Sequence, residues 1–576
     1  MRKVLVGLVV LASLAAAVPA AEEVLTPAGY LALKLEADAL WEAGDREGAL
    51  PLYARLHAAN PADGDLAFRL ARGLHGAGRV EEALPIGLAA LESGFADEAS
   101  ASYAVAQAAA KEGDADTALA WIDRTLAAGW EDRPVLQTDE AFAALTGDPR
   151  FRELAGFAPE GLDRVAGWRF DLGFFVEEAQ RLHADPGRPA FSEGFLASVA
   201  ALKERVPTLD DVAVAMELQK IIASQLGDGH SVLYPLPTER VPFGGLLPVS
   251  FYFFPEGLHV VAADAGHEEL VGMRVDAIGG TSIAGVLDDL ATIVSHDNEM
   301  GIRWIGPLYL RGPAVLRALG SVDDLGPVTL TLTGRDGAPR EATLEPVPPR
   351  AMSERLPAPP GAADPPRWLA RAGEPYWHEA IPALDAVYLQ LNQVRDAEEG
   401  PPIPAFAEAV RDALRATGAR NLIIDVRHNN GGNNFLHWPL VRLVAWHGLA
   451  GEDHRTFVVT GRGTFSACQD FVNFLERATD AVFVGEHSSS RPNFAGESTS
   501  VLLPWSGIRM SISSRWWQDS YPGDERPYIP VSMPVELGFE DWWAGRDPVL
   551  EALGEVLGEA RKNREETSTG APAGGP

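Results

Sequence analysis

Three loops in the sequence carry residue types that could do chemistry together. They are residues 226–231, with the sequence LGDGHS, residues 425–432, DVRHNNGG, and residues 461–467, GRGTFSA. The first loop supplies His230, whose unperturbed pKa suits a general base near neutral pH. The third supplies Ser466, and a serine hydroxyl is a poor nucleophile unless a base accepts its proton. Together these residue types suit acyl transfer to a serine.

Ser466 is expected at the junction of a strand and a helix, residues 456–460 and 467–477. There its hydroxyl would be presented on a turn. The first N–H groups of the helix have no partner inside it and would favour a developing oxyanion. The glycine pair 431–432 would let further N–H groups approach a substrate carbonyl. A purely structural alternative is that Ser466, followed three residues later by Gln469, forms a capping box.

The region that must position these loops alternates between strands and helices from Tyr376 onward. The sequence predicts buried strands at residues 421–426, 456–460 and 481–484. It predicts helices between them at residues 406–417, 435–446 and 467–477. This alternation predicts a parallel or mixed sheet covered by helices.

Residues 29–130 contain an internal repeat, marked by Gly44, Gly78 and Gly113, which stand 34 (78−44) and 35 (113−78) residues apart. A helical pattern precedes and follows each glycine, which would allow the turn between the two helices. The pattern resembles the tetratricopeptide repeat, a helix-turn-helix unit of about 34 residues. We therefore expect α-helical repeats over residues 21–158, either as a module that recruits a protein partner or as a rigid spacer.

Two further regions lie between the repeats and the α/β region. Residues 165–235 are expected to form a helical segment whose last helix stops at Gly227. Residues 236–350 are rich in strand-forming residues, and the stretch LVGMRVDAIGGTSI within them resembles a PDZ domain. A Pro-rich linker, residues 351–366, follows. The predicted fold class is therefore multidomain α+β, with helical repeats, a helical segment, a β-rich PDZ-like domain and an α/β core.

The three loops, in this order, resemble those of the tail-specific (C-terminal-processing) and tricorn-core serine peptidases. The resemblance extends over roughly residues 170–555 and includes the closing stretch 540–550, EDWWAGRDPVL. It implies an α/β serine peptidase core over residues 367–560. It also implies an oxyanion hole formed by the N–H of Ala467 and one from Gly432.

The base separates the two branches of this group. Tail-specific members use a lysine some two dozen residues after the serine, but this sequence has no lysine between Ile221 and Arg561. A Ser–Lys dyad is therefore excluded. Tricorn-type members instead use a histidine from the helical segment, and His230 matches that position. His428, in the glycine-pair loop, is the rival base.

Tricorn-type sites also use an acid near the C-terminus. The matching stretch is residues 518–526, QDSYPGDER, in which Asp524 or Glu525 could orient His230. Both could equally be solvated turn residues.

The composition bounds the partners. The formal net charge is −33 and no basic run interrupts it, so binding to nucleic acid or anionic lipid is not expected. No zinc motif and no phosphate-binding loop occurs, so we expect neither a metal nor an organic cofactor. The only cysteine, Cys468, excludes an intramolecular disulfide and is expected to be a small buried hydrophobe.

The two ends of the sequence have signals of their own. A basic start, an apolar run over residues 4–18 and small residues up to Ala20 predict a signal peptide, residues 1–20, and hence export to the periplasm or beyond the cell. No other segment approaches the ~20 apolar residues of a membrane span. A polar, Gly/Pro-rich composition predicts a disordered tail over residues 561–576.

The sequence thus predicts an exported serine endopeptidase that cleaves peptides or proteins through an acyl-enzyme on Ser466, with His230 as general base. The alternative is a catalytically inactive protein of the same fold that binds a peptide or another ligand. Geometry separates the two, because a binding protein has no reason to bring the His230 imidazole to Ser466.

Overall fold

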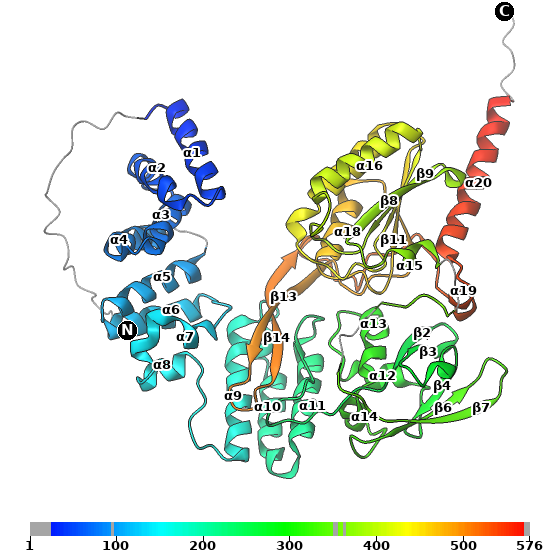
Figure 1. Ribbon diagram of the computed structural model, residues 1–576, viewed down its shortest axis with the longest axis horizontal. Coiled ribbons are helices and arrows are strands. Elements are labelled where there is room, and N and C mark those ends of the chain that lie inside the picture. Colours follow the sequence, from blue (N-terminus) through cyan, green and yellow to red (C-terminus); the bar gives the residue numbers. More distant parts are fainter. Residues whose placement is uncertain (1–24, 94–96, 350–354, 361–364, 570–576) are drawn as a thin grey trace, which may run out of the picture. The chain divides into compact units, whose positions relative to one another are not determined.

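The computed structural model describes residues 25–93, 97–349, 355–360 and 365–569. These residues form two compact units, one ending at Ala155 and the other beginning at Gly156 (Figure 1). The predicted signal peptide lies outside the described residues. In the part of the chain that is described, no helix combines the length and the apolar character needed to cross a bilayer.

The first unit consists of helices that pack each against the next. Its longer helices are α1 (Pro27–Glu42), α2 (Arg46–Ala59), α3 (Gly64–Gly76), α4 (Val80–Glu92), α5 (Glu98–Lys111) and α6 (Ala115–Ala127). Gly44, Gly78 and Gly113 follow the ends of α1, α3 and α5 with φ of 84°, 75° and 81°. This left-handed conformation favours glycine, so each of the three makes the turn that its spacing predicted. The short helices α7 (Val135–Thr138) and α8 (Pro149–Leu154) complete the unit.

The second unit begins with a layer of helices that leads to His230. The helices are α9 (Arg164–Leu182), α10 (Glu193–Arg205) and α11 (Asp211–Ile221). α11 continues as a single π-helical turn, Ile222–Leu226, and stops at Gly227, where φ is 73°. Such turns are rare and often mark functional positions. The chain then passes through His230 into a two-residue strand, β1 (Val232–Leu233).

The β-rich region forms an antiparallel sheet with the strand order β2-β3-β4-β6-β7. Its strands are β2 (Val249–Phe254), β3 (Gly257–Ala263), β4 (Arg274–Ile278), β5 (Thr281–Ser282, paired with β4), β6 (Val328–Thr333) and β7 (Pro339–Leu344). The accompanying helices are α12 (Val286–Ala291), α13 (Glu299–Tyr309) and α14 (Pro313–Ala318). Alternate side chains of β6 are buried, as expected for a sheet with one face on the core.

The α/β region is a sheet with the order β15-β12-β11-β10-β9-β8, parallel except for β8 at one edge. Its strands are β8 (Tyr376–Ile381), β9 (Ala386–Leu391), β10 (Asn421–Asp425), β11 (Arg455–Thr460), β12 (Val482–Gly485) and β15 (Met533–Pro534). The helices between its parallel strands are α16 (Ile403–Thr417), α17 (Trp438–Leu449) and α18 (Ala467–Ala478). Every residue of β10 is buried, as in a strand covered on both faces. The expected multidomain α+β fold class is confirmed, and Cys468 is buried in this core.

A long hairpin joins the α/β region to the helical layer. Strands β13 (Asn493–Leu502) and β14 (Arg509–Gln518) pair with each other (Figure 1). Strand β14 also pairs with β1. In register, Val232 lies opposite Ser511. The sequence analysis did not foresee this hairpin, which brings the His230 loop to the strands that follow β12.

The C-terminal end differs from its prediction. After α19 (Phe539–Trp543), helix α20 runs from Pro548 to Thr569. The expected disorder over residues 561–576 is therefore wrong for residues 561–569, and residues 570–576 lie outside the described part. The stretch is rich in Glu, Arg and Lys, which are good helix formers, so polarity alone did not indicate disorder.

Candidate active site

Ser466 adopts a strained backbone conformation between β11 and α18. Its φ is 54° and its ψ is −129°, a region that residues with a Cβ rarely occupy. The Ser466 side chain makes no capping hydrogen bond to α18. Gln469 instead donates its amide to Asn473 Oδ1 at 2.9 Å. The capping-box alternative is therefore wrong, and the strained turn presents a hydroxyl that the helix does not use.

Hydrogen bonds tie the serine loop to the glycine-pair loop. The Phe465 N–H donates to Asn429 O at 3.1 Å. The Thr464 hydroxyl accepts from Gly461 N–H at 3.1 Å and donates to Val426 O at 3.0 Å. The second and third loops thus meet at the carboxyl ends of β10 and β11, as adjacent parallel strands require.

The glycine pair makes room for Ser466. A Cβ placed on Gly431 would lie 2.8 Å from Ser466 Cβ and 3.1 Å from the Ala467 nitrogen. The Gly431 N–H already donates to Asn429 Oδ1 at 3.0 Å. Within the described residues, neither the Gly432 N–H nor the Ala467 N–H donates a hydrogen bond. These two N–H groups, which the family resemblance implies for the oxyanion hole, are the ones left available.

His230 lies beside the serine loop, although 236 residues (466−230) separate the two in sequence. Its ring stacks on Phe465, the residue before Ser466, with ring centroids 4.3 Å apart, and on Phe494 at 5.6 Å. Neither ring nitrogen of His230 meets hydrogen-bond geometry with any described residue, Ser466 included, although the Ala495 backbone lies close enough to raise the pKa of the ring. The structure brings the first and third loops together without forming the base–nucleophile hydrogen bond. Such bonds are often long or absent before substrate binds.

The His230 imidazole is neutral over the physiological range. Burial lowers the pKa of His230 to about 4, although the nearby Asp228 carboxylate acts in the opposite direction. A neutral imidazole can accept a proton. Burial therefore keeps His230 in the deprotonated form that a general base requires.

The two predicted acids do not contact the His230 ring. Asp524 accepts from Arg526 at 2.7 and 2.9 Å and from the Ser520 hydroxyl at 2.6 Å. These hydrogen bonds, that of Arg526 first, hold the pKa of Asp524 well below its ordinary value. Glu525 is exposed. The Arg526 guanidinium, two residues away, forms a bidentate ion pair with the Asp524 carboxylate. Asp524 therefore binds Arg526 and does not orient the histidine.

The rival base, His428, faces another part of the sheet edge. Its Nε2 lies 3.1 Å from Trp368 O, and its ring stacks on the Trp368 indole with centroids 5.2 Å apart. Because a carbonyl oxygen only accepts, Nε2 carries the hydrogen. Burial lowers the pKa of His428 to about 4. It packs against Trp368, whereas the ring stacked beside Ser466 is that of His230.

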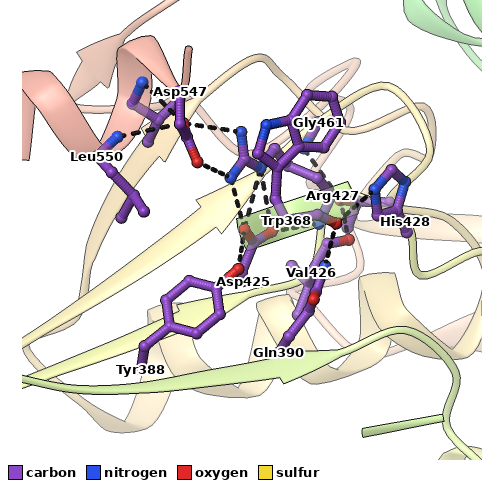
Figure 2. A network of polar contacts seen from close by, with 12 residues as sticks. Trp368, Tyr388, Gln390, Asp425, Val426, Arg427, His428, Gly461, Asp547 and Leu550 are labelled. Carbon is purple, nitrogen blue, oxygen red and sulfur yellow. Dashed lines mark hydrogen bonds and ion pairs between the residues drawn. The ribbon is translucent and has the colours of Figure 1, made fainter. Parts of the chain in front are cut away.

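Figure 2 shows the ion-pair network that holds the start of the glycine-pair loop. The Arg427 guanidinium donates to Asp425 at 2.6 Å and to Asp547 at 2.8 Å, and it covers the Trp368 ring. Tyr388 donates its hydroxyl to Asp425 at 2.7 Å. Asp547 stands just before α20, so the network also anchors the C-terminal helix to the sheet edge.

A cavity of about 360 Å³ opens over this edge of the sheet. Asn430 and Gly463 bring the second and third loops into its wall, and Tyr252, Trp304 and Trp368 supply aromatic surface. Crevices at the carboxyl ends of parallel strands are common ligand sites. Gly461, Arg462 and Gly463 of the serine loop line this cavity together with His428, whereas Ser466 and His230 are not part of its wall.

The sequence analysis missed two residues of the site that its own motifs contained. Ser490 stands 24 residues (490−466) after Ser466, where the tail-specific group carries its lysine, and its Oγ accepts the Ser466 N–H at 3.3 Å. Asp228 lies two residues before His230 in the first loop. The spacing pointed to both positions, but neither residue type matched the expected role.

No protein-family model and no curated protein matches this chain. Among solved structures, it is similar to mature CPAF complexed with lactacystin, at 15% identity and a TM-score of 0.47, over 68% of this chain and 98% of that one. It is also similar to the photosystem II D1 C-terminal processing protease, at 15% identity and a TM-score of 0.32, over 68% and 97% of the two chains. The tricorn protease matches at 12% identity and a TM-score of 0.31, over 69% and 37%. These structures belong to the peptidase group that the three loops resemble.

Proposed function

We propose that this chain is an exported serine peptidase that hydrolyses peptide bonds through an acyl-enzyme on Ser466. One observation carries the proposal: a strained, non-capping serine stands against a glycine pair, with a neutral imidazole stacked on the adjacent residue. Strain of ~1–3 kcal/mol at such a residue persists only where the surrounding structure enforces it. A helix cap does not need that conformation.

The proposed reaction follows from these positions. His230 accepts the proton of the Ser466 hydroxyl as Oγ bonds to the substrate carbonyl carbon, and the carbonyl electrons move to its oxygen. The N–H groups of Ala467 and Gly432 stabilise that oxyanion. The imidazolium returns its proton to the leaving nitrogen as the C–N bond breaks, and water repeats the sequence to release the acyl group. The His230 ring must turn toward Oγ when substrate binds.

Three other features of the chain support its export, its substrate class and its partner. The basic and apolar start of the sequence supports export to the periplasm or outside the cell. The cavity beside the serine loop supports a peptide or protein substrate. The helical first unit supports a role in recruiting a protein partner, because it forms a compact unit of its own.

A second candidate function is ligand binding without catalysis. It is favoured by the unpaired His230 ring, which has no carboxylate on either nitrogen in the described structure. In this case Ser466 would have a neighbour but no base, and the protein would bind a peptide in the same cavity without cleaving it.

Labelling with a fluorophosphonate tests the two candidates directly. The wild type should be modified on Ser466, and Ser466→Ala should lose both the label and the cleavage of an unfolded protein substrate by several orders of magnitude. Ser282→Ala, which changes an exposed serine on β5, is the matched control and should behave as wild type. A wild-type protein that binds peptide but is neither labelled nor active would establish the binding function instead.

A further inference from the structure

The buried carboxylate of Asp228, which has no role in the reaction described above, accepts four hydrogen bonds. Its Oδ1 accepts the His230 N–H at 2.8 Å, the Ser231 N–H at 2.6 Å and the Ser513 hydroxyl at 2.6 Å. Its Oδ2 lies 2.9 Å from His183 Nε2. Asp228 is only 3% exposed, so these four hydrogen bonds replace the water that a carboxylate would otherwise bind.

These partners come from different elements of the fold. His183 is the residue that follows α9, and its side chain is fully buried. Because a carboxylate only accepts, the His183 Nε2 carries the hydrogen. Ser513 lies on β14, whose residue Ser511 donates its hydroxyl to His230 O at 2.7 Å. The main chain of His230 is thus held at its N–H and its C=O, between the helical layer and the hairpin.

The ring of His230 is placed by packing and by the Ala495 backbone, without a side-chain acceptor among the described residues. It stacks on Phe465 and Phe494, the Ala495 backbone lies close enough to raise its pKa, and neither ring nitrogen meets full hydrogen-bond geometry with a described residue. The position of the His230 ring therefore depends on the position of the His230 main chain. We infer that Asp228 is the positioning residue of the general base, and that it acts through the main chain of His230 instead of through the ring. This inference rests on the proposed function.

The charge of Asp228 has a second effect on the same base. Burial would raise the pKa of Asp228, but the hydrogen bond and charge of His183, with Ser513 and the loop N–H groups, lower it to about 2. The other carboxyl beside the loop is Asp297, which accepts the Gly229 N–H at 2.8 Å. Burial and the Asp228 charge raise the pKa of Asp297 to about 7, so Asp228 is the one ionised below neutral pH. Its charge favours the imidazolium that forms when Ser466 loses its proton.

The kinetic test compares three variants in the full chain. Asp228→Ala should lower kcat for a peptide substrate by about 10²-fold, as expected for a displaced catalytic group, with KM unchanged. Asp228→Asn should lower kcat by a smaller factor than Asp228→Ala, because the amide oxygen of Asn can still accept the two N–H groups. His183→Gln, which keeps an N–H donor near Asp228 Oδ2, should lower kcat less than Asp228→Ala does.

Asp171→Asn is the matched control. Asp171 on α9 is also buried and accepts two N–H groups, from Trp505 and Ser506, both at 2.8 Å. It ties the same helix to the same hairpin at a point away from the His230 loop. Its variant should lose stability without losing kcat. Equal kcat values for the Asp228→Ala and Asp171→Asn variants would overturn the inference.

A titration separates this inference from the proposed function. The Asp228 charge raises the pKa of His230, so Asp228→Asn should keep the imidazole neutral to a lower pH than in wild type. We would follow the His230 ring signals by NMR in Ser466→Ala protein, with and without Asp228→Asn, so that the measurement does not depend on activity. An unchanged His230 titration would overturn the inference, whereas absent labelling with a shifted titration would overturn only the peptidase function.

Discussion

Asp297 provides a test of the electrostatics around the His230 loop. Its carboxyl is 4% exposed, its Oδ1 accepts the Gly229 N–H, and its Oδ2 has no partner among the described residues. Burial, and then the charge of Asp228, raise the pKa of Asp297 from the ordinary 3.8 to about 7. The native protein should therefore keep this carboxyl protonated in a pH range where the unfolded chain ionises it.

The sign of the stability effect follows from proton uptake. Between pH 3.8 and about 7 the native state binds more protons at Asp297 than the unfolded state does. Stability then falls as pH rises through this window and levels off above it. Between pH 5 and pH 8, the free energy of unfolding falls only up to the native pKa of about 7, which is about two pH units. At 1.36 kcal/mol per unit, the loss of stability is about 3 kcal/mol. Asp297→Asn removes this loss, because an amide does not ionise.

The measurement is the difference in unfolding free energy between variant and wild type. Urea unfolding of the full chain, followed by tryptophan fluorescence at pH 5, 6, 7 and 8, should show that Asp297→Asn gains about 3 kcal/mol over wild type across the range. Asp171→Asn gives a comparison, because burial raises the pKa of Asp171 only to about 6, so its stability difference from wild type should stop changing with pH near that value. A flat difference for Asp297→Asn, with unchanged m-values, would show that the buried carboxyl is ionised and refute the reasoning.

Two further predictions concern the oxyanion loop and the first unit. Gly431→Ala should slow fluorophosphonate labelling by about 10²-fold, because its Cβ would press on Ser466 at a φ of 115°. Gly400→Ala, with a φ of 133° but its nearest contact 3.7 Å away, should label normally, and equal losses would contradict the steric argument. Deleting residues 21–155 should leave the cleavage of short peptides near wild type, since the second unit is compact by itself. Loss of that cleavage in a folded truncation would show that the first unit supports the site.

Local patterns predicted the parts of the fold that local physics decides. The buried strands of the α/β sheet were readable because each is a short apolar run between helical patterns, as in Asn421–Asp425. The β13–β14 hairpin was not, because Gly, Ser, Thr and Glu interrupt its apolar residues and mask its strand pattern. The helix over residues 561–569 was missed for the opposite reason. Its charged composition resembled disorder, although those same residues are good helix formers.

The candidate site shows the same division between local and distant information. The Ser466 turn and the glycine pair could be predicted, since their conformations depend on neighbours within a few residues. The approach of His230 to the serine loop was expected only by resemblance, because no local pattern spans 236 residues (466−230).

The acid that we propose for the His230 loop could not be chosen from sequence, because that choice depends on which partner each carboxylate finds in the fold. Arg526 binds Asp524, whereas Asp228 accepts hydrogen bonds from two N–H groups of its own loop, from Ser513 on β14 and from His183 after α9. Asp228 stood inside the loop quoted for His230, yet its importance lies in contacts with α9 and β14 that only the folded chain creates. A carboxylate that orients a histidine through its main chain leaves no spacing signature toward the ring, so a search for catalytic triads in sequence will overlook it.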